Sequence, residues 1–387
     1  MIVTATRTAE STDRIGSAVT VITAEQMQQQ KAHTVLDILR SLPGVHVVRT
    51  GTLGKTTSIF LRGSNSDHAL VMLDGVQMNS LTTGAFEWAN LTIDNLDRIE
   101  IVGGPQSTLY GSDALGGVIN VITRKGIGKP KLQLHASASS LSVFTEQATV
   151  RGTSKKVSYS VAASRTDSSG LDSTDTPIYQ EPQEGSESVI VDRYVETVYG
   201  NDDYDNTTVS GRVSYQLSEA VSLDFVGRFY RGAGGIPGQL VLGNDGSIAT
   251  DFDRNANQTQ SDGMGLVSLN AKLLENLQSR LNLSLGVGSI VFEDLKDPNE
   301  ESAFETHSKI NANTLTADWQ NTFRAPVSES IENKIVLGAE IENQNARNAD
   351  ELTGTETFDE SVTNVAFYAQ EGFSWANRFF LNALSVL

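Results

Sequence analysis

From Lys131 onward, apolar residues recur at every second position, and this alternation restricts the fold more than any other feature of the chain. In residues 281–287, four apolar side chains alternate with Asn282, Ser284 and Gly286. A period of two places alternate side chains on opposite faces of a β-strand. About eleven such segments follow one another. They are expected to start near Lys131, Phe144, Lys156, Thr207, Val221, Gly263, Arg280, Asn313, Asn333, Asn364 and Arg378.

The second face of these strands is polar, which separates them from the strands of a soluble sandwich. Charged residues on that face include Arg212, Asp224 and Glu340. Short turns at one end alternate with long polar loops at the other. Apolar-out, polar-in strands connected in this way are typical of a transmembrane β-barrel. We therefore predict an antiparallel transmembrane β-barrel from residue 127 onward.

The predicted wall is smaller than that of a barrel that encloses a plug. Such barrels have about 22 strands, so about half of the wall would lie outside the sequence. Unpaired strand edges in a bilayer cost several kcal/mol for each backbone group. We therefore expect the 387 residues to be an N-terminal fragment, with the barrel truncated to about half its strands, that does not work alone.

Composition excludes several classes of protein. The formal charge of −18 argues against a nucleic-acid binder. The chain has no cysteine, so neither disulfides nor thiolate metal sites form. No run of about 18 apolar residues is present, which excludes a membrane-spanning helix. Between Asp167 and Asn206, eleven Asp and Glu residues accompany one basic residue, Arg193, which predicts a solvated acidic loop.

Residues 1–126 show a different pattern, with helix signals between short strands. Thr23 and Gln26 form a capping-box sequence. Thr34 is a plausible N-cap for a second helix with an apolar face, which ends at Pro43-Gly44. Mixed short elements predict an α+β domain. The strand–bend–strand stretch from Ile99 to Gly126 closes this domain and leads into the wall, so we predict two domains, 1–126 and 127–387.

Three runs in the first domain resemble the signature of TonB-dependent outer-membrane receptors. They are SIFLRGSN (58–65), ALVMLDGVQMN (69–79) and GPQSTLYGSDALGGVINVIT (104–123), and their order and spacing also match. The second domain is similar in architecture. Within the family the first two runs most resemble the cobalamin (vitamin B12) receptors. One departure is Gly103, where the family usually carries a basic residue that helps anchor the plug to the barrel.

The resemblance implies a plug domain inside an outer-membrane barrel, in the outer membrane of a Gram-negative cell. It implies active import of a scarce large nutrient, with cobalamin as the expected substrate. The energy would come from TonB and its inner-membrane complex. Ile2, Val3, Thr4 and Ala5 resemble the TonB box, a short extended segment that pairs with the sheet edge of its partner. No signal peptide precedes Ile2, so we expect a trimmed or partial sequence.

The resemblance also implies site residues. Two loops, 50–57 and 79–88, match the apical plug loops that touch the substrate. The residues carried over from these loops are Thr50, Leu53, Lys55, Thr56, Thr82, Thr83 and Phe86. Arg62 matches a cation that latches the plug to barrel glutamates. Asp172, Asp202 and Asp203 match an extracellular calcium site, since clustered carboxylates suit Ca²⁺, although a solvated acidic loop explains them as well.

No constellation in the sequence predicts an enzyme or a required cofactor. Ser66, Asp67 and His68 are sequence neighbours, which is not the spatial arrangement of a catalytic triad. The glycines at 111, 116 and 117 are not followed by the Gly-Lys-Ser/Thr of a phosphate-binding loop. Three alternatives remain open. They are a ferric siderophore or haem receptor of the same class, a passive outer-membrane pore, and a surface binding or adhesion protein.

Overall fold

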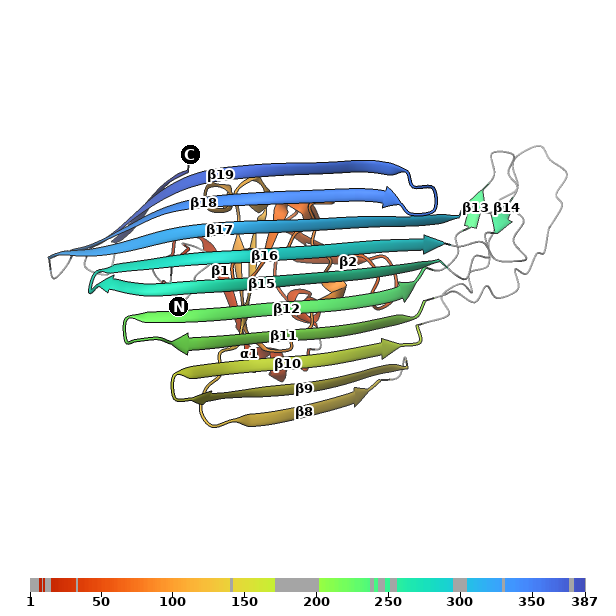
Figure 1. Ribbon diagram of the computed structural model, residues 1–387, viewed down its shortest axis with the longest axis horizontal. Coiled ribbons are helices and arrows are strands. Elements are labelled where there is room, and N and C mark those ends of the chain that lie inside the picture. The colour runs from red at the N-terminus through yellow and green to blue at the C-terminus, as the bar shows by residue number, and fades with distance from the viewer. Residues whose placement is uncertain are drawn as a thin grey trace.

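The computed structural model describes residues 7–8, 10, 15–32, 34–139, 142–170, 202–236, 240–242, 248–250, 256–294, 305–328, 331–375 and 379–386. A small mixed domain, the plug, lies against one side of a large curved antiparallel sheet, the wall (Figure 1). No helix among these residues is long and apolar enough to cross a membrane. The predicted domain boundary at residue 126 falls between the last plug strand and the first wall strand.

The plug contains short strands and short helices, as its sequence predicts. Its five-stranded sheet has the order β1-β6-β7-β4-β5, and β2 pairs with β3 in a separate hairpin. The strands are β1 (Ala18–Thr23), β2 (Val45–Arg49), β3 (Thr57–Leu61), β4 (Ala69–Leu73), β5 (Val76–Gln77), β6 (Leu96–Gly103) and β7 (Gly117–Thr123). The helices are α1 (Ala24–Gln29), α2 (Val35–Leu39) and α3 (Ser107–Tyr110), with 3₁₀ turns at Ser66–His68, Trp88–Asn90 and Ser112–Ala114.

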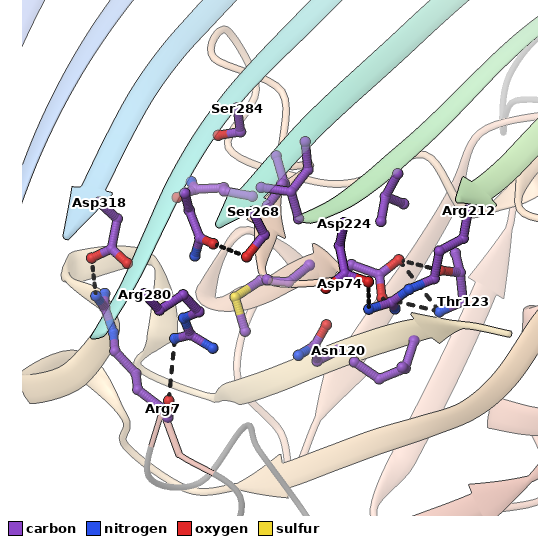
Figure 2. A pocket seen from close by; sticks show the side chains of 18 of the residues that line it. Arg7, Asp74, Asn120, Thr123, Arg212, Asp224, Ser268, Arg280, Ser284 and Asp318 are labelled. Carbon is purple, nitrogen blue, oxygen red and sulfur yellow. Dashed lines mark hydrogen bonds and ion pairs between the residues drawn. The ribbon is translucent and has the colours of Figure 1, made fainter. Parts of the chain in front are cut away.

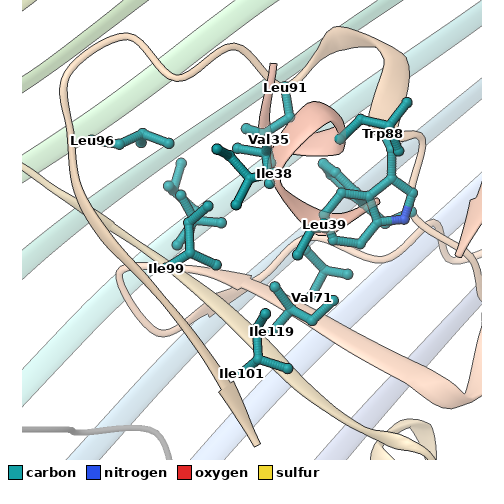
Figure 3. Packing of buried hydrophobic residues seen from close by; sticks show 14 of the residues in the cluster. Val35, Ile38, Leu39, Val71, Trp88, Leu91, Leu96, Ile99, Ile101 and Ile119 are labelled. Carbon is teal, nitrogen blue, oxygen red and sulfur yellow. The ribbon is translucent and has the colours of Figure 1, made fainter. Parts of the chain in front are cut away.

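Local sequence signals explain where the plug helices begin. Thr23 caps α1 and forms the predicted capping box with Gln26. Thr34 caps α2 in the same way, with Asp37 as its partner. Val35, Ile38 and Leu39 are fully buried, and the core they form with β-strand residues lies between α2 and the sheet (Figure 3). Burial of this apolar face holds so short a helix in place.

The wall confirms the predicted strand series. Its eleven strands follow the chain in order, with antiparallel neighbours throughout. They are β8 (Lys131–Ala138), β9 (Val143–Ser154), β10 (Val157–Ser168), β11 (Tyr204–Gln216), β12 (Val221–Gly235), β15 (Asn257–Leu274), β16 (Leu277–Asp294), β17 (Thr306–Ser328), β18 (Ile331–Asp350), β19 (Glu356–Trp375) and β20 (Phe379–Val386). Within the described residues the sheet is open, with β8 and β20 at its edges.

The two ends of the wall differ. Tight turns lie at the end that we call the inner end, and the longer connections lie at the outer end (Figure 1). A small hairpin of β13 (Leu240–Leu242) and β14 (Ile248–Thr250), which the sequence pattern did not predict, lies in one outer connection. Apolar side chains such as Leu134 and Trp319 point away from the plug and are more than half exposed, whereas Ser160 on the plug side is fully buried. This confirms the predicted apolar and polar faces.

Several strands extend further outward than the alternation predicted. β17 starts at Thr306 rather than near Asn313, and β19 starts at Glu356 rather than near Asn364. The outer extensions of both strands are mostly polar and lack regular alternation, as in the TFDES of β19. Their backbone still pairs with the neighbouring strand. Pairing therefore continues where side-chain alternation, the sequence signal for a strand, has already ended.

Candidate functional site

The loop 50–57 lies at the outer end of the plug, where the resemblance places a substrate-binding loop. The Thr50 amide donates to the carbonyl of Thr56 at 3.1 Å, which closes the loop. Thr50 and Thr56 are exposed, while Leu53 is half-buried. The Thr50 hydroxyl also donates to the Thr56 carbonyl at 3.2 Å, and contact of the two exposed threonines with a ligand stays a prediction.

Lys55 of the same loop points to the wall. Its ammonium lies 3.0 Å from Asp202 Oδ1, just before β11. It also donates to the carbonyl of Gly235, the last residue of β12. The Lys55 side chain is 15% exposed and that of Asp202 is 3% exposed. One residue predicted to bind substrate and one predicted to bind metal thus form a buried ion pair with each other.

The second apical loop, 79–88, is organised by the buried side chain of Asn79. Its amide donates to the carbonyls of Ala69 and Gly84, and its oxygen accepts from the Val71 amide at 2.8 Å. Thr82 and Thr83 at the tip are exposed. Their hydroxyls also form hydrogen bonds within the loop, with Ser80 for Thr82 and with the Ala85 amide for Thr83, so their contact with a ligand stays a prediction.

Phe86, at the base of the same loop, belongs to the plug core. It is 9% exposed and packs edge-on against Trp88, with ring centroids 4.9 Å apart. Phe86 therefore helps to hold the loop in place and offers little surface to a ligand.

Glu87 joins the two apical loops. Its Oε1 accepts from the amides of Thr57 and Ala89, both at 3.1 Å. Burial raises the pKa of Glu87 to about 7, and the nearby carboxyl of Asp262 contributes to the rise. The hydrogen bonds that connect the two loops therefore involve a carboxyl group that titrates near neutral pH.

Asn90 fastens the plug to the wall below these loops. Its side-chain oxygen accepts from the Tyr204 hydroxyl at 2.6 Å and from the Asn206 amide at 3.0 Å. Its carbonyl accepts from Arg228 at 3.0 Å. All four residues are buried. This group, together with Lys55, fixes the outer half of the plug to β11 and β12.

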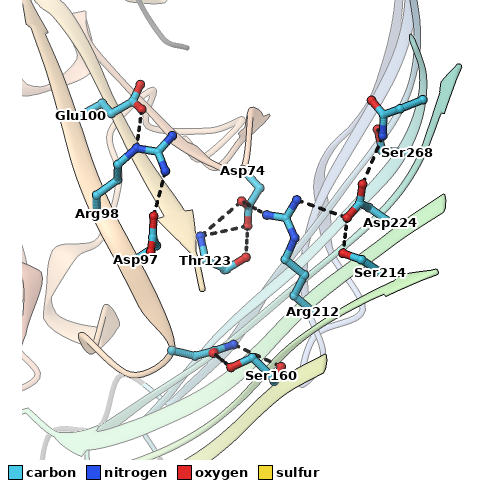
Figure 4. A network of polar contacts seen from close by, with 12 residues as sticks. Asp74, Asp97, Arg98, Glu100, Thr123, Ser160, Arg212, Ser214, Asp224 and Ser268 are labelled. Atoms are coloured by element: carbon cyan, nitrogen blue, oxygen red, sulfur yellow. Dashed lines mark hydrogen bonds and ion pairs between the residues drawn. The ribbon is translucent and has the colours of Figure 1, made fainter. Parts of the chain in front are cut away.

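A charged network fastens the inner half of the plug. Asp74, in the Asp-Gly turn after β4, accepts two bonds from Thr123 and lies 3.1 Å from Arg212 of β11. Arg212 also reaches Asp224 of β12 at 3.4 Å (Figure 4). Burial raises the pKa of Asp74, while Arg212 and Thr123 lower it. The Thr123 and Arg212 contacts favour the carboxylate form of Asp74.

A cavity of about 680 Å³ separates the plug from the wall beside this network. Its lining is more polar than apolar, and the charged side chains of Arg212, Asp224, Arg280 and Asp318 line the wall side (Figure 2). Met72 and Asn120 line it from the plug strands β4 and β7. Such a lining suits water and polar groups rather than an apolar ligand.

Arg7 holds the N-terminal segment at the inner half of the wall. Its guanidinium lies 3.1 Å from Glu340 and 3.8 Å from Asp318. It also lies over the rings of Tyr110 and Tyr368, at 5.0 and 4.6 Å from their centroids. Burial raises the pKa of the Tyr110 phenol to about 12, so the ring faces Arg7 in its neutral form. The segment that follows the predicted TonB box is therefore attached to the inner half of the wall.

Glu10 adds a second contact in the N-terminal segment. Its carboxylate lies 2.6 Å from the ammonium of Lys334, near the inner end of β18. The hydroxyl of Thr8 accepts from the same ammonium at 3.0 Å. The attachment is therefore spread over residues 7–10 rather than confined to Arg7.

Other predicted site residues are not brought together. Ile2, Val3, Thr4, Ala5 and Asp172 lie outside the described residues. Arg62 is exposed and forms no ion pair within the described part of the chain. Its guanidinium lies over Gly103, where an added Cβ would be 2.8 Å from Arg62 Nε. Glycine at position 103, where the family usually carries a basic residue, therefore leaves room for Arg62. The role of Arg62 as a latch stays a prediction.

At the acidic start of β11, the two described carboxylates contact protein partners, and the calcium prediction stays a prediction. Asp202 is paired with Lys55, and Asp203 accepts from the Gly235 amide at 2.9 Å. No cluster of three or more carboxylate or histidine side chains is found in the parts of the chain that are described. Calcium prefers six to eight oxygen ligands. The calcium prediction stays untested for Asp172.

The plug contacts of Asp74, Asn90 and Arg7 were not predicted from the sequence. In the sequence, Asp74-Gly75 is typical of a tight turn, and only the approach of β11 brings Arg212 to the Asp74 side chain. Arg212 and Asp224 were placed on the polar face of the wall, which is where the structure has them. A charge on the inward face of a barrel strand is a signal for a plug contact, but it does not identify the partner.

Comparisons with known proteins agree with this arrangement. Residues 11–118 match the family model of the TonB-dependent Receptor Plug Domain. The chain is 25% identical over 372 residues to the vitamin B12 transporter BtuB of Photobacterium profundum, covering 95% of this chain and 53% of that protein. The chain thus spans about half the length of this relative.

Solved structures share the fold. The ferripyoverdine receptor of the outer membrane of Pseudomonas aeruginosa matches with a TM-score of 0.73 at 15% identity, over 100% of this chain and 53% of that chain. The ferric preacinetobactin receptor BauA of Acinetobacter baumannii matches with a TM-score of 0.68 at 10% identity, over 97% of this chain and 61% of that chain. At these identities the likeness concerns the fold alone.

Proposed function

We propose that this chain belongs to a TonB-dependent receptor of the outer membrane of Gram-negative cells, a transporter that imports cobalamin with energy delivered through TonB. TonB-dependent receptors are transporters rather than enzymes, and no chemistry on the substrate is proposed. Substrate binds to the exposed hydroxyls of the apical loops and to outer connections of the wall. Substrate binding then changes the plug, and TonB pairs with Ile2–Ala5 and pulls.

One observation carries the proposal, namely that the plug carries its apical loops on its outer side and is attached through the N-terminal segment to the inner half of the wall. Thr50, Thr56 and Thr82 are exposed at its outer side, while Arg7 and Glu10 are attached to the inner half of the wall. A ligand that arrives from outside and a protein that pulls from inside would therefore act on opposite ends of the same domain. A passive pore has no need of this arrangement.

Cobalamin is favoured over other substrates by the 25% identity to a vitamin B12 transporter. The apical loops agree with a large, partly polar ligand, because they offer threonine hydroxyls rather than a dense aromatic or arginine-lined pocket. A ferric siderophore is the competing substrate within the same family.

The test uses the full-length protein that contains this chain. Cyanocobalamin is titrated by calorimetry, with a ferric siderophore as control, and uptake is measured in cells with and without deletion of Ile2–Ala5. We expect cobalamin binding without siderophore binding, and loss of uptake but not of binding in the deletion variant. Siderophore binding would replace the substrate assignment. Uptake that survives the deletion would indicate a passive pore, and binding without uptake would indicate a surface receptor.

A further inference from the structure

We infer that the Lys55 ammonium connects the plug to the wall at the ends of two outer connections. It supplies the positive charge that a metal ion would otherwise be expected to supply at this position. Lys55 donates to Asp202, which precedes β11, and to the Gly235 carbonyl, which ends β12. The connection 171–201 ends at Asp202, and the connection after β12 starts just beyond Gly235. One ammonium therefore joins three parts of the molecule.

The groups that bind the Lys55 ammonium are held in place by other contacts of the wall. The Asp203 carboxylate accepts from the Gly235 amide at 2.9 Å, which fixes the peptide next to the carbonyl that faces Lys55. Gly170 lies against the backbone of Asp202, where an added Cβ would be 2.0 Å from the Asp202 carbonyl oxygen. The end of β10 and the start of β11 thus meet directly at the ion pair.

The plug loop that carries Lys55 also packs closely against the wall. Gly54 has a φ of +79° and lies on the ring of Tyr204, where an added Cβ would be 1.9 Å from a ring carbon. This contact holds Lys55 against the wall at one position along β11. An ammonium is a compact charge with three donors, which suits a carboxylate and a carbonyl that converge at one point.

The position also explains why a positive charge is needed. The segment from Asp167 to Asn206 carries eleven acidic residues and only Arg193 as a base. Within this segment the Asp202 carboxylate is buried, and a buried carboxylate requires a partner. A metal ion supplies such charge only while it is present in the medium, whereas Lys55 moves with the plug. If the proposed transport function holds, the outer connections are therefore coupled to the position of the plug and not to the calcium concentration.

The experiment measures hydrogen exchange in the full-length protein, with no substrate present. Amides of residues 53–57 and 203–206 are followed with EDTA and with millimolar Ca²⁺, and Ca²⁺ binding is measured by calorimetry. The variants are K55M, D202N and the double variant K55M/D202N, which removes both charges of the ion pair. K309M is the matched control, because Lys309 is an ion-paired lysine of β17 far from the plug loop.

We expect exchange in the unmodified protein to be the same with EDTA and with Ca²⁺. K55M should raise exchange in both segments by about tenfold or more, because breaking a buried pair leaves an uncompensated charge. The double variant, which leaves no unpaired charge, should still exchange faster than the unmodified protein, and K309M should not. Ca²⁺ binding that D202N abolishes, or unchanged exchange in K55M, would overturn the inference. None of these results depends on whether cobalamin is the substrate.

Discussion

Arg212 of the wall lies with its Nη1 3.1 Å from Asp74 Oδ1 of the plug, and the two side chains are only 14% and 6% exposed. Asp74 is in the turn between β4 and β5, and Arg212 is near the inner end of β11. At the outer end of the same strand, Tyr204 and Asn206 bind Asn90 of the plug. β11 therefore holds the plug at both of its ends.

Removal of the Arg212 charge is expected to loosen the inner end of the plug. R212M leaves Asp74 and Asp224 without their shared cation, and breaking a buried pair costs about 3–5 kcal/mol. Hydrogen exchange of β4 in the full-length protein should rise accordingly, and cells should become more permeable to large antibiotics. R165M is the control, because Arg165 is 50% exposed and should shift stability by less than about 0.5 kcal/mol. Unchanged exchange in R212M would show that the pair does not hold the plug.

Glu87 makes the stability of the plug depend on pH. Its folded pKa of about 7 exceeds its ordinary value of about 4.3. Between these two values the folded protein keeps a proton that the unfolded chain releases, so the free energy of unfolding falls as pH rises. The total fall is up to roughly 4 kcal/mol.

E87Q tests this dependence, because its amide oxygen still accepts from Thr57 and Ala89 but carries no charge. Denaturation of the full-length protein at several pH values should show a smaller fall for E87Q than for the unmodified protein. D67N is the control, since Asp67 is an exposed plug carboxylate, and the slope should persist in that variant. An identical slope in E87Q would assign the pH dependence to another group.

Two glycines with the same backbone conformation separate backbone strain from packing. Gly54 and Gly63 have φ values of +79° and +82°, and only Gly54 has a neighbour in the path of a Cβ, namely the Tyr204 ring. Alanine at either position costs roughly 1–2 kcal/mol for the left-handed conformation. G54A should in addition separate the loop from the wall, measured as faster exchange of residues 53–57. Equal effects of G54A and G63A on that segment would argue against the contact.

Arg7 controls how firmly the N-terminal segment is attached. R7M removes the pairing with Glu340 and Asp318 and both ring contacts. The N-terminus should then react faster with a thiol reagent at a cysteine introduced at Thr4. R347M is the control, because Arg347 is 56% exposed near the outer end of β18. Equal labelling rates in R7M and the unmodified protein would mean that other contacts, such as Lys334 with Glu10, hold the segment.

The sequence by itself determined the strand series, the two faces of the wall and the starts of the plug helices. These features depend on residues that are close together in the chain. Alternation sets the faces of a strand, and Thr23 and Thr34 cap helices through residues three positions away. Three short runs also indicated a resemblance to a family, because their order and spacing match its signature.

The tertiary structure alone decided which side chains meet between plug and wall. Lys55 and Asp202, or Asp74 and Arg212, are more than a hundred positions apart, and no local pattern specifies such pairs. Their partners depend on how far the plug reaches along β11 and on which inward residue of a strand faces it. Lys55, a predicted substrate ligand, forms an ion pair with Asp202 of the wall, and its contact with substrate stays a prediction. Its local sequence describes an exposed polar loop, whereas burial against the wall requires that its charge be paired.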